Sequence, residues 1–504
     1  MTSIEVDPNE LTRRIMNYLF KNPFAEDERK NDLGIKNGAT LVIQEEDYHL
    51  LRNHLLRPDG LERISFVFFG IQGKDPLRKL FVHRVINLED SDYSSQTPSY
   101  VVPRTKKQIE IFKAFEEAKT SGLLHVHSHP FCRKAQFSPV DENMAAGAIR
   151  SLRDYLLAGG IKSVFYFGRM VLGQDEGGFS GSIQNQDSSQ SQEIINIQVV
   201  GPRGISKINS KISSIKNPVE TMLEPDILDR NIRWLGDEGQ SKLSETHLVI
   251  CGLGGAGSMV ALNARGLGFK KITLIDHDRI EKSNLNRLPG ATRNDVGEFK
   301  VAVMKRMIEE VGLPTEVVAI PQKMELAQKA LKEGDILIAG VDSFKARFDL
   351  QILAARHLIP LIDIGSGIMI NQETRRIQAM GGQVSFYIPG GPCLCCQAVV
   401  PREIDSEISQ EVKRATGYVQ GTDLTPTSVV TINSILAGQA MDMLIKYITG
   451  LMLPASHIKC DLLSNTYGNF NFRRKELCPI CGDNGIEGVG EETIQLTPHH
   501  NWRS

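Results

Sequence analysis

The chain has no apolar run that approaches the roughly 20 residues needed to cross a bilayer. Its first ten residues lack the basic start and apolar middle of a signal peptide, so we expect a cytoplasmic protein with no membrane partner. An excess of charge is also missing, because 58 Lys and Arg face 60 Asp and Glu, for a formal net charge of -2. This balance argues against bulk binding of nucleic acid, and we expect no such partner.

Cysteine is scarce as well, with 8 among 504 residues. So few cysteines in so long a chain do not form a disulfide framework, and four of them fall into two C-x-x-C pairs, which indicate metal in a reducing compartment. Four thiolates suit a closed tetrahedral zinc site that stabilises the fold. We predict that this structural zinc is bound by Cys393, Cys396, Cys478 and Cys481, with Cys395 left over.

The length is enough for two to four domains, each with its own core. A segment rich in Ser, Lys, Asn and Gly separates two regions of different pattern and is typical of a linker. We predict an N-terminal helical extension over residues 1–38, a first domain over 39–200, the linker over 201–224, a second domain over 225–483 and a mobile, polar tail over 484–504.

The first domain carries three histidines at the end of a predicted strand, in the sequence HVHSHPFCRKAQFSPVD over residues 125–141. Residues two apart share a face of a strand, so two imidazoles can bind one metal ion, and an Asp at the start of the next helix can complete the set. A zinc ion held by three side chains lowers the pKa of its bound water to around 7 and supplies a hydrolytic nucleophile. A bare H-x-H is more often a pair of exposed polar residues without metal, but Ser138 and Asp141 favour the metal.

This stretch resembles the JAMM (JAB/MPN, Mov34-type) metalloprotease family, whose motif is a distant Glu, then HxHP and a following SxxD. The resemblance implies a cytidine-deaminase-like α/β domain. It also implies that His127, His129 and Asp141 bind a catalytic zinc and that Ser138 helps to stabilise the oxyanion. Eleven residues separate His129 from Asp141, one more than the family pattern.

The family also uses a glutamate that takes a proton from the attacking water and passes it to the leaving amine. Glu62, at the start of the predicted strand ERISFVFFG, fits this position best. Glu45 and Glu46 are the alternatives, and His125 is assigned a supporting or structural role.

The second domain opens with a strand, a glycine turn and a small-residue helix, followed by a strand that ends on an acid. Glycines allow a tight turn and a close backbone approach, the helix N-terminus faces an anion, and the acid can hold a ribose. Dehydrogenases and methyltransferases use similar turns. The residues predicted to bind the nucleotide here are Gly252, Gly254, Gly255, Gly257 and Asp276.

The segment that follows, DHDRIEKSNLNR, resembles the DxDxVxxSNLxRQ segment of the E1/MoeB/ThiF superfamily, with Leu288 in place of the usual Gln. The resemblance implies a Rossmann-like, doubly wound sheet. It also implies that the enzyme activates the C-terminal glycine of a ubiquitin-like or sulphur-carrier protein as an acyl-adenylate. Adenylation joins a carboxylate to a polyanionic ATP, so cations must neutralise and position the phosphates.

The resemblance assigns that task to Arg287 and Lys300, and it assigns Mg²⁺ to Asp342. Arg233 would reach the ATP of a partner subunit in a homodimer. A lone Arg or Lys is usually a solvated surface charge, but here the spacing of the whole set outweighs that interpretation. The further nucleotide contacts are assigned to Ser283, Asn284, Asn286 and Ser343.

No cysteine lies in the loop over residues 401–427, where thioester-forming relatives place their catalytic thiol. Activation therefore stops at the adenylate, as in MoeB-like members, or the thiol comes from Cys395, a partner protein or a sulphur donor. Cys132, Cys251 and Cys460 are expected to be structural.

The sequence thus predicts one chain with two activities on one partner, zinc-dependent trimming or deconjugation followed by ATP-dependent activation. An E2-like protein or a sulphurtransferase would act next. Two alternatives stay open: activation of a sulphur carrier for cofactor or cysteine biosynthesis, and a JAMM domain that only binds the partner. For a bacterial chain, the architecture also resembles ubiquitin-like pathways of antiphage defence.

Overall fold

The computed structural model describes residues 38–73, 78–118, 120–158, 165–186, 191–210, 225–371, 374, 376–400 and 429–491. The predicted N-terminal helix, the second part of the linker, the 401–427 loop and the end of the tail lie outside these residues. In the part that is described, no helix is both long and apolar enough to cross a membrane.

The N-terminal domain is built on an eight-stranded sheet in the order β1-β3-β2-β6-β7-β8-β9-β10. Strand β1 also pairs with β9, so seven of the strands close into a barrel, a feature that the predicted cytidine-deaminase-like fold did not include. The strands are β1 (Gly38–Gln44), β2 (Ile64–Gln72), β3 (Lys79–Asn87), β6 (Gly122–Ser128), β7 (Tyr166–Leu172), β8 (Phe179–Asn185), β9 (Gln192–Gly201) and β10 (Gly204–Asn209).

Both faces of this sheet are covered, which explains why every residue of β2 is buried. Alternate β2 residues such as Val67 and Phe69 pack with helix α2 (Glu45–Leu55). The residues between them, Phe66 and Phe68, pack with the helices α3 (Thr105–Ala118) and α4 (Pro139–Ala158). A short ribbon of β4 (Tyr93–Thr97) and β5 (Tyr100–Pro103) follows the 3₁₀ turn η1 (Asp90–Asp92).

The second domain is a second eight-stranded sheet, in the order β13-β12-β11-β14-β15-β16-β17-β18. The pairings from β13 to β15 are parallel and the later ones are antiparallel. The strands are β11 (His247–Cys251), β12 (Lys271–Ile275), β13 (Glu316–Ile320), β14 (Ile336–Ala339), β15 (Leu361–Ile370), β16 (Ile377–Tyr387), β17 (His457–Asp461) and β18 (Thr466–Phe470).

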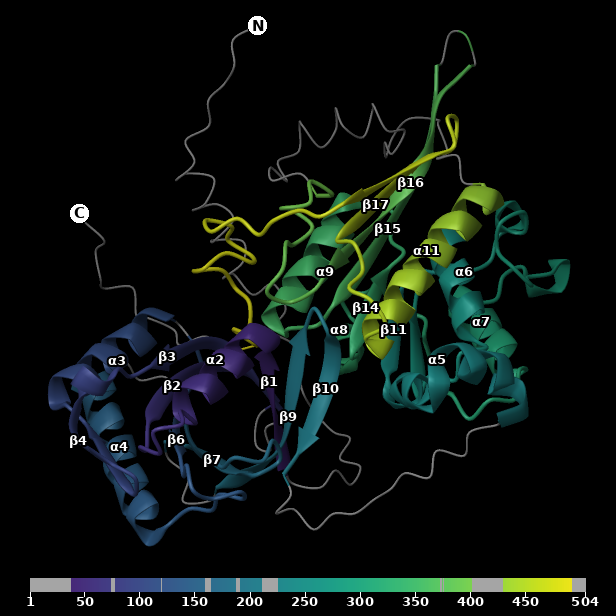
Figure 1. Cartoon of the computed structure of the whole chain (residues 1–504). Helices are drawn as coiled ribbons and strands as arrows, with labels where there is room; N and C mark the ends of the chain where they lie inside the picture. The colour runs from purple at the N-terminus through teal and green to yellow at the C-terminus, as the bar shows by residue number, and fades with distance from the viewer. Residues whose placement is uncertain are drawn as a thin grey trace, which may run out of the picture.

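Helices cover both faces of this sheet, as the doubly wound prediction requires (Figure 1). The helices of one face are α5 (Pro225–Glu245), α6 (Gly255–Ala264), α7 (Lys300–Glu309) and α11 (Val430–Thr449), and those of the other are α8 (Gln328–Glu333) and α9 (Phe344–Arg356). The parallel strands follow the Rossmann order 3-2-1-4-5, so the winding reverses between β11 and β14. Sheets of this kind bind ligands in the crevice at that reversal.

Two predicted boundaries are wrong. The linker was placed from residue 201, but β10 pairs antiparallel with β9 and Ile205 packs against the core of the second domain. The mobile tail was placed from residue 484, but Ile486 and Val489 are buried. Composition suggested mobility because the tail is polar and rich in glycine. In the structure, the same glycines allow the backbone of the tail to lie close to neighbouring strands.

Candidate nucleotide and metal sites

The glycine turn lies between β11 and α6, beside the end of β14. Gly252 has a φ of 86°, which favours glycine, and a Cβ on Gly257 would lie 1.9 Å from the carbonyl oxygen of Gly252. The Gly340 N–H donates to the carbonyl of Cys251, so β14 is held against the turn. A Cβ on Gly254 would meet nothing within 4 Å, so the open side of the turn lies there. Gly255 begins α6, whose N-terminus is therefore next to that open side.

Asp276 directly follows β12 and is buried beneath the turn. Its carboxylate accepts the N–H of Leu253 at 2.6 Å and the N–H of Asp278 at 2.7 Å. These contacts make Asp276 the residue that fixes the turn, while its predicted contact with a ribose stays a prediction. Asp278, with half of its side chain exposed, is the nearby acid that sequence reasoning did not assign, although the DxD spacing contains it.

The structure brings Lys300 to the same place, because Lys300 Nζ lies 2.7 Å from Asp278 Oδ2. Lys300 is the first residue of α7 and its side chain is only 10% exposed. Its charge is therefore held at the edge of the turn by an acid that remains accessible to a ligand.

The other two predicted cations are more accessible, since Arg287 is partly exposed and Arg233 is exposed. Arg287 donates to the carbonyl of Ser283 at 2.7 Å and to Asn286 Oδ1 at 3.2 Å. The Asn284 side chain accepts the N–H of Glu281 in the 3₁₀ turn η2 (Lys282–Asn284), which shapes this segment. Arg233 lies on α5, where it pairs with Asp229 at 2.9 Å, and its predicted contact with a second subunit stays a prediction.

Asp342 and Ser343 follow β14. Asp342 is exposed, whereas the Ser343 hydroxyl accepts the N–H of Ala346 and caps α9. The sequence did not point to Arg347, one turn further on, which is buried and lies 2.7 Å from the carboxylate of Asp363. Arg347 also donates to the carbonyl of Val341 at 3.1 Å, so a buried ion pair fixes the loop that carries Asp342.

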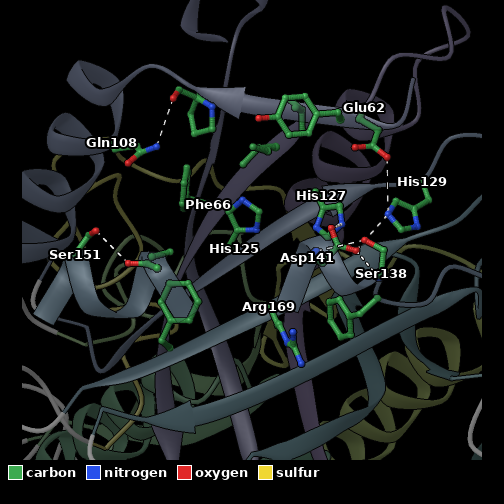
Figure 2. Close-up of a pocket in the computed structure, with 18 of the residues that line it drawn as sticks. Glu62, Phe66, Gln108, His125, His127, His129, Ser138, Asp141, Ser151 and Arg169 are labelled. Carbon is green, nitrogen blue, oxygen red and sulfur yellow. Dashed lines mark hydrogen bonds and ion pairs between the residues drawn. The ribbon is translucent and has the colours of Figure 1, made fainter. Parts of the chain in front are cut away.

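In the N-terminal domain, His127 of β6 and His129, which directly follows β6, meet Asp141 of α4 (Figure 2). His127 Nε2 lies 3.1 Å from Asp141 Oδ1, and His129 Nε2 lies 3.6 Å from Asp141 Oδ2. Within the described part of the chain, His127 Nδ1 is buried without a hydrogen-bond partner, and His127 Nε2 has its ion-pair contact with Asp141. Two imidazoles and a carboxylate whose ligand atoms lie within 4.8 Å of one another are a donor set that zinc accepts, so this group fits zinc.

Glu62 and Ser138 flank this group. Glu62 Oε1 lies 3.8 Å from His129 Nε2, and burial, together with the nearby charge of Asp141, raises the pKa of Glu62 to about 7. The Ser138 N–H donates to Asp141 at 2.6 Å, while the Ser138 hydroxyl accepts the Asp141 N–H. The alternative Glu45 instead forms an ion pair with Arg203.

His125 lies between this group and Phe66, with its ring 5.4 Å from the Phe66 ring. Burial lowers the pKa of His125 to about 3, so the imidazole is neutral. The supporting or structural role assigned to His125 stays a prediction.

The four predicted cysteines meet although they come from two distant parts of the chain. The Sγ atoms of Cys393 and Cys478 lie 3.6 Å apart, and those of Cys396 and Cys481 lie 3.7 Å apart. A tetrahedral zinc with Zn–S bonds of ~2.3 Å has thiolates roughly 3.8 Å apart, so this group fits zinc.

All eight cysteines are described and none forms a disulfide, as composition predicted. Cys395 stays outside the four and is partly exposed. Burial raises the pKa of the Cys251 thiol to about 12, which suits its predicted structural role.

The strand order, the glycine turn and the acid beneath it define the second domain as a nucleotide-binding unit of the Rossmann class. The model of the ThiF family matches residues 228–480, half of the chain, and the protein belongs to this family. The predicted membership of the E1/MoeB/ThiF superfamily is therefore confirmed.

Named relatives align with about half of the chain. The SAMP-activating enzyme E1 of Haloferax volcanii is 25% identical over 276 residues, which are 53% of this chain and 93% of that enzyme. The sulfur carrier protein adenylyltransferase of Thermus thermophilus is 26% identical over 260 residues, 49% of this chain and 87% of that enzyme. Among solved structures, E. coli MccB is 24% identical with a TM-score of 0.44, covering 55% of this chain and 76% of MccB.

Proposed function

We propose that the second domain uses ATP to adenylate the C-terminal carboxylate of a ubiquitin-like or sulphur-carrier protein. The observation that carries this proposal is the glycine turn at the reversal between β11 and β14, with Lys300 and Asp278 at its edge. The names of the two similar enzymes from Haloferax and Thermus support the class of partner.

Each group has a task in this reaction. The backbone N–H groups at the start of α6 face the phosphates, and Arg287 and Lys300 neutralise them. A carboxylate oxygen of the partner attacks the α-phosphorus and pyrophosphate leaves, so the product is an acyl-adenylate. Asp342 would hold Mg²⁺, an ion that prefers carboxylate and phosphate oxygens. The ribose would be bound by Asp276 or by Asp278, and the Asp278 side chain is the more exposed of the two.

Activation would end at the adenylate within this chain unless Cys395 supplies a thiol. Cys251 is buried under the turn with a pKa of about 12, and the four clustered cysteines would be occupied by the proposed structural zinc. An E2-like protein or a sulphurtransferase would then accept the acyl group. A homodimer in which Arg233 reaches the neighbouring ATP is part of the same proposal.

The N-terminal domain is proposed to be a JAMM-like hydrolase that trims residues beyond the partner's C-terminal glycine or releases the partner from a conjugate. His127, His129 and Asp141 would hold zinc, which supplies a Lewis acid at the scissile carbonyl. Glu62 would accept a proton from the attacking water and give it to the leaving amine. The Ser138 hydroxyl keeps its proton for the developing oxyanion, because it accepts rather than donates in its bond to Asp141.

ATP–pyrophosphate exchange with purified partners that end in glycine tests the adenylation. Lys300→Ala, Arg287→Ala and Asp342→Ala are each expected to lower exchange by about 100-fold or more, because the first two remove a cation that faces the phosphates and the third removes the proposed Mg²⁺ ligand. Lys305→Ala is the matched control, since Lys305 lies on the same helix in an exposed pair with Glu309.

The hydrolase is tested with the same partners extended beyond the glycine. His127→Ala should abolish cleavage and leave exchange intact, whereas Lys300→Ala should do the reverse. ATP–pyrophosphate exchange that persists in the Lys300→Ala protein would contradict the proposed adenylation site. If the zinc-loaded wild-type protein cleaves none of these partners, the hydrolase proposal is contradicted and this domain is assigned the alternative role of binding the partner.

A further inference from the structure

A cavity of about 470 Å³ opens beside the metal-binding group of the N-terminal domain. It is lined at one end by Glu62, His127, His129 and Asp141. From there it extends into the layer between the sheet and the helices α3 and α4 (Figure 2). Its volume lies within the range of small-ligand pockets, roughly 300–1,000 Å³.

The far end of the cavity is apolar. Phe66 of β2, Phe112 of α3 and Phe167 of β7 line it, together with Tyr100 and Val101 of β5. The three phenylalanines are almost fully buried, so their rings form fixed walls. Aromatic walls of this kind favour aromatic or large aliphatic groups.

Three polar side chains along the cavity are bonded to their own neighbours. Gln108 donates to the carbonyl of Pro103, and Ser151 donates to the carbonyl of Gly147. Arg169 stacks its guanidinium 4.3 Å from the centre of the Phe137 ring and donates to Ser182. These contacts make the cavity suited to an apolar group rather than a charged one.

Helix α4 provides small residues where it faces this space. Gly147 and Ala148 line the cavity, and a Cβ on Gly147 would meet nothing within 4 Å. The space is therefore open at this point of the wall, and a larger side chain at 147 would enter it without backbone strain.

We propose that this cavity is a specificity pocket for a bulky apolar residue, aromatic or leucine-like, on the leaving-group side of the bond that the metal site cleaves. This inference rests on the proposed hydrolase function, in which the retained side ends in glycine. Glycine has no side chain to fill a pocket, so the occupant must come from the segment that is removed. The natural substrate is then a partner whose C-terminal glycine is followed by a large apolar residue.

Binding of acetyl-Gly-Gly-Phe-amide and acetyl-Gly-Gly-Ala-amide to the full-length Glu62→Gln protein tests the pocket without turnover. Calorimetry or NMR titration is expected to show the Phe peptide binding at least tenfold more tightly, because its ring leaves water for an apolar site. In the same background, Gly147→Leu should reduce this preference to less than threefold. Gly147→Ala should retain most of it, and Leu157→Ala, an exposed position on the same helix, should retain all of it.

Equal binding of the two peptides, or an unchanged preference in Gly147→Leu, would overturn the pocket. Gly147→Leu protein with the thermal melting profile of Gly147→Ala serves as the check on folding. The hydrolase itself is judged separately by cleavage of both peptides with zinc-loaded wild-type protein. Selective binding without any cleavage would support the pocket and contradict the proposed hydrolysis.

Discussion

At the scale of single residues, the informative side chains are buried polar groups that no motif contains. Glu487 is 6% exposed and accepts the Tyr387 hydroxyl at 2.6 Å, the Gly390 N–H at 3.2 Å and the Gln44 amide at 3.1 Å. Its partners belong to both domains, because Gln44 ends β1 whereas Tyr387 ends β16. Sequence composition had placed this residue in a mobile tail, since an isolated Glu among glycines is normally solvated.

Glu487 predicts a pH dependence of stability. Burial, opposed by these hydrogen bonds and by the charge of Arg474, raises the pKa of Glu487 from 4.5 to about 7. A raised carboxyl pKa means that the folded state binds the proton more tightly. The contribution of the Glu487 carboxyl to the free energy of unfolding is therefore complete below about pH 4.5 and is lost as pH rises through about 7. We expect Glu487→Gln to remove this loss of stability at high pH. In denaturant unfolding at pH 8, the free energy of unfolding of the variant should exceed that of the wild type by at most on the order of 3 kcal/mol.

Two other groups near Glu487 must be separated from this effect. The His83 ring contacts the backbone carbonyl of Glu487 at 2.7 Å, and burial lowers the pKa of His83, so its titration falls at more acidic pH. The Tyr387 pKa is raised by burial and by the charge of Glu487, so it titrates far above pH 8. Glu476→Gln, at an exposed position, is the control, and an unchanged pH profile in Glu487→Gln would contradict the prediction.

At the scale of elements, the start of α6 shows how a local pattern fixes a site. The glycine spacing predicted the turn because the local geometry requires glycine at these positions. Gly252 has a positive φ, and Gly257 packs closely against the backbone of the turn. Helix α11 is set by local signals as well, since its apolar residues face the core and the terminal Gly450 has a positive φ.

The glycines of the turn are expected to respond differently to alanine. Gly257→Ala would drive a methyl group into the carbonyl of Gly252, so it should lower the melting temperature and abolish exchange. Gly254→Ala places its methyl group in open space, so the fold should persist while nucleotide binding weakens by at least tenfold. Thermal unfolding and ATP binding measure the two effects.

Gly266→Ala is the matched control, because a Cβ there also meets nothing within 4 Å and Gly266 lies just beyond the C-terminal end of α6, away from the turn. It should leave both measurements unchanged. A Gly254→Ala protein that binds ATP like the wild type would place the nucleotide elsewhere.

At the scale of the whole molecule, the segment that follows the second cysteine pair joins the two domains (Figure 1). The Gly70 N–H of β2 donates to the carbonyl of Gly488, and the Glu491 N–H donates to the carbonyl of Ile71. On the other side, Arg356 of α9 donates to the carbonyl of Gly490 at 2.8 Å. The four-cysteine site lies at the root of this segment, so a zinc ion there would hold the contact between the domains.

Loss of the structural zinc is therefore expected to loosen the domain contact. Wild-type protein should contain two zinc ions per chain, and Cys481→Ser should contain one. In Cys481→Ser, the Gly70 amide should exchange its hydrogen at least tenfold faster, because its partner Gly488 is released. Elemental analysis and hydrogen-exchange mass spectrometry provide the two measurements.

Two controls separate the metal sites. Cys395→Ser, outside the four cysteines, should keep both zinc ions and normal exchange at Gly70. His127→Ala should lose one zinc ion without affecting the domain contact. Normal exchange at Gly70 in a Cys481→Ser protein that has lost zinc would show that the contact does not depend on the metal.

The sequence alone determined the features whose geometry is local. The glycine turn, the two C-x-x-C pairs and the alternating histidines each place their groups through a few bonds of known helix, strand or turn geometry. Tertiary structure alone decided what joins distant parts of the chain. It closed β1 onto β9, brought Glu62 to His129, buried Glu487 between the domains and paired Arg347 with Asp363. These contacts depend on how whole layers pack, because burial and partner are set by surfaces that no local spacing encodes.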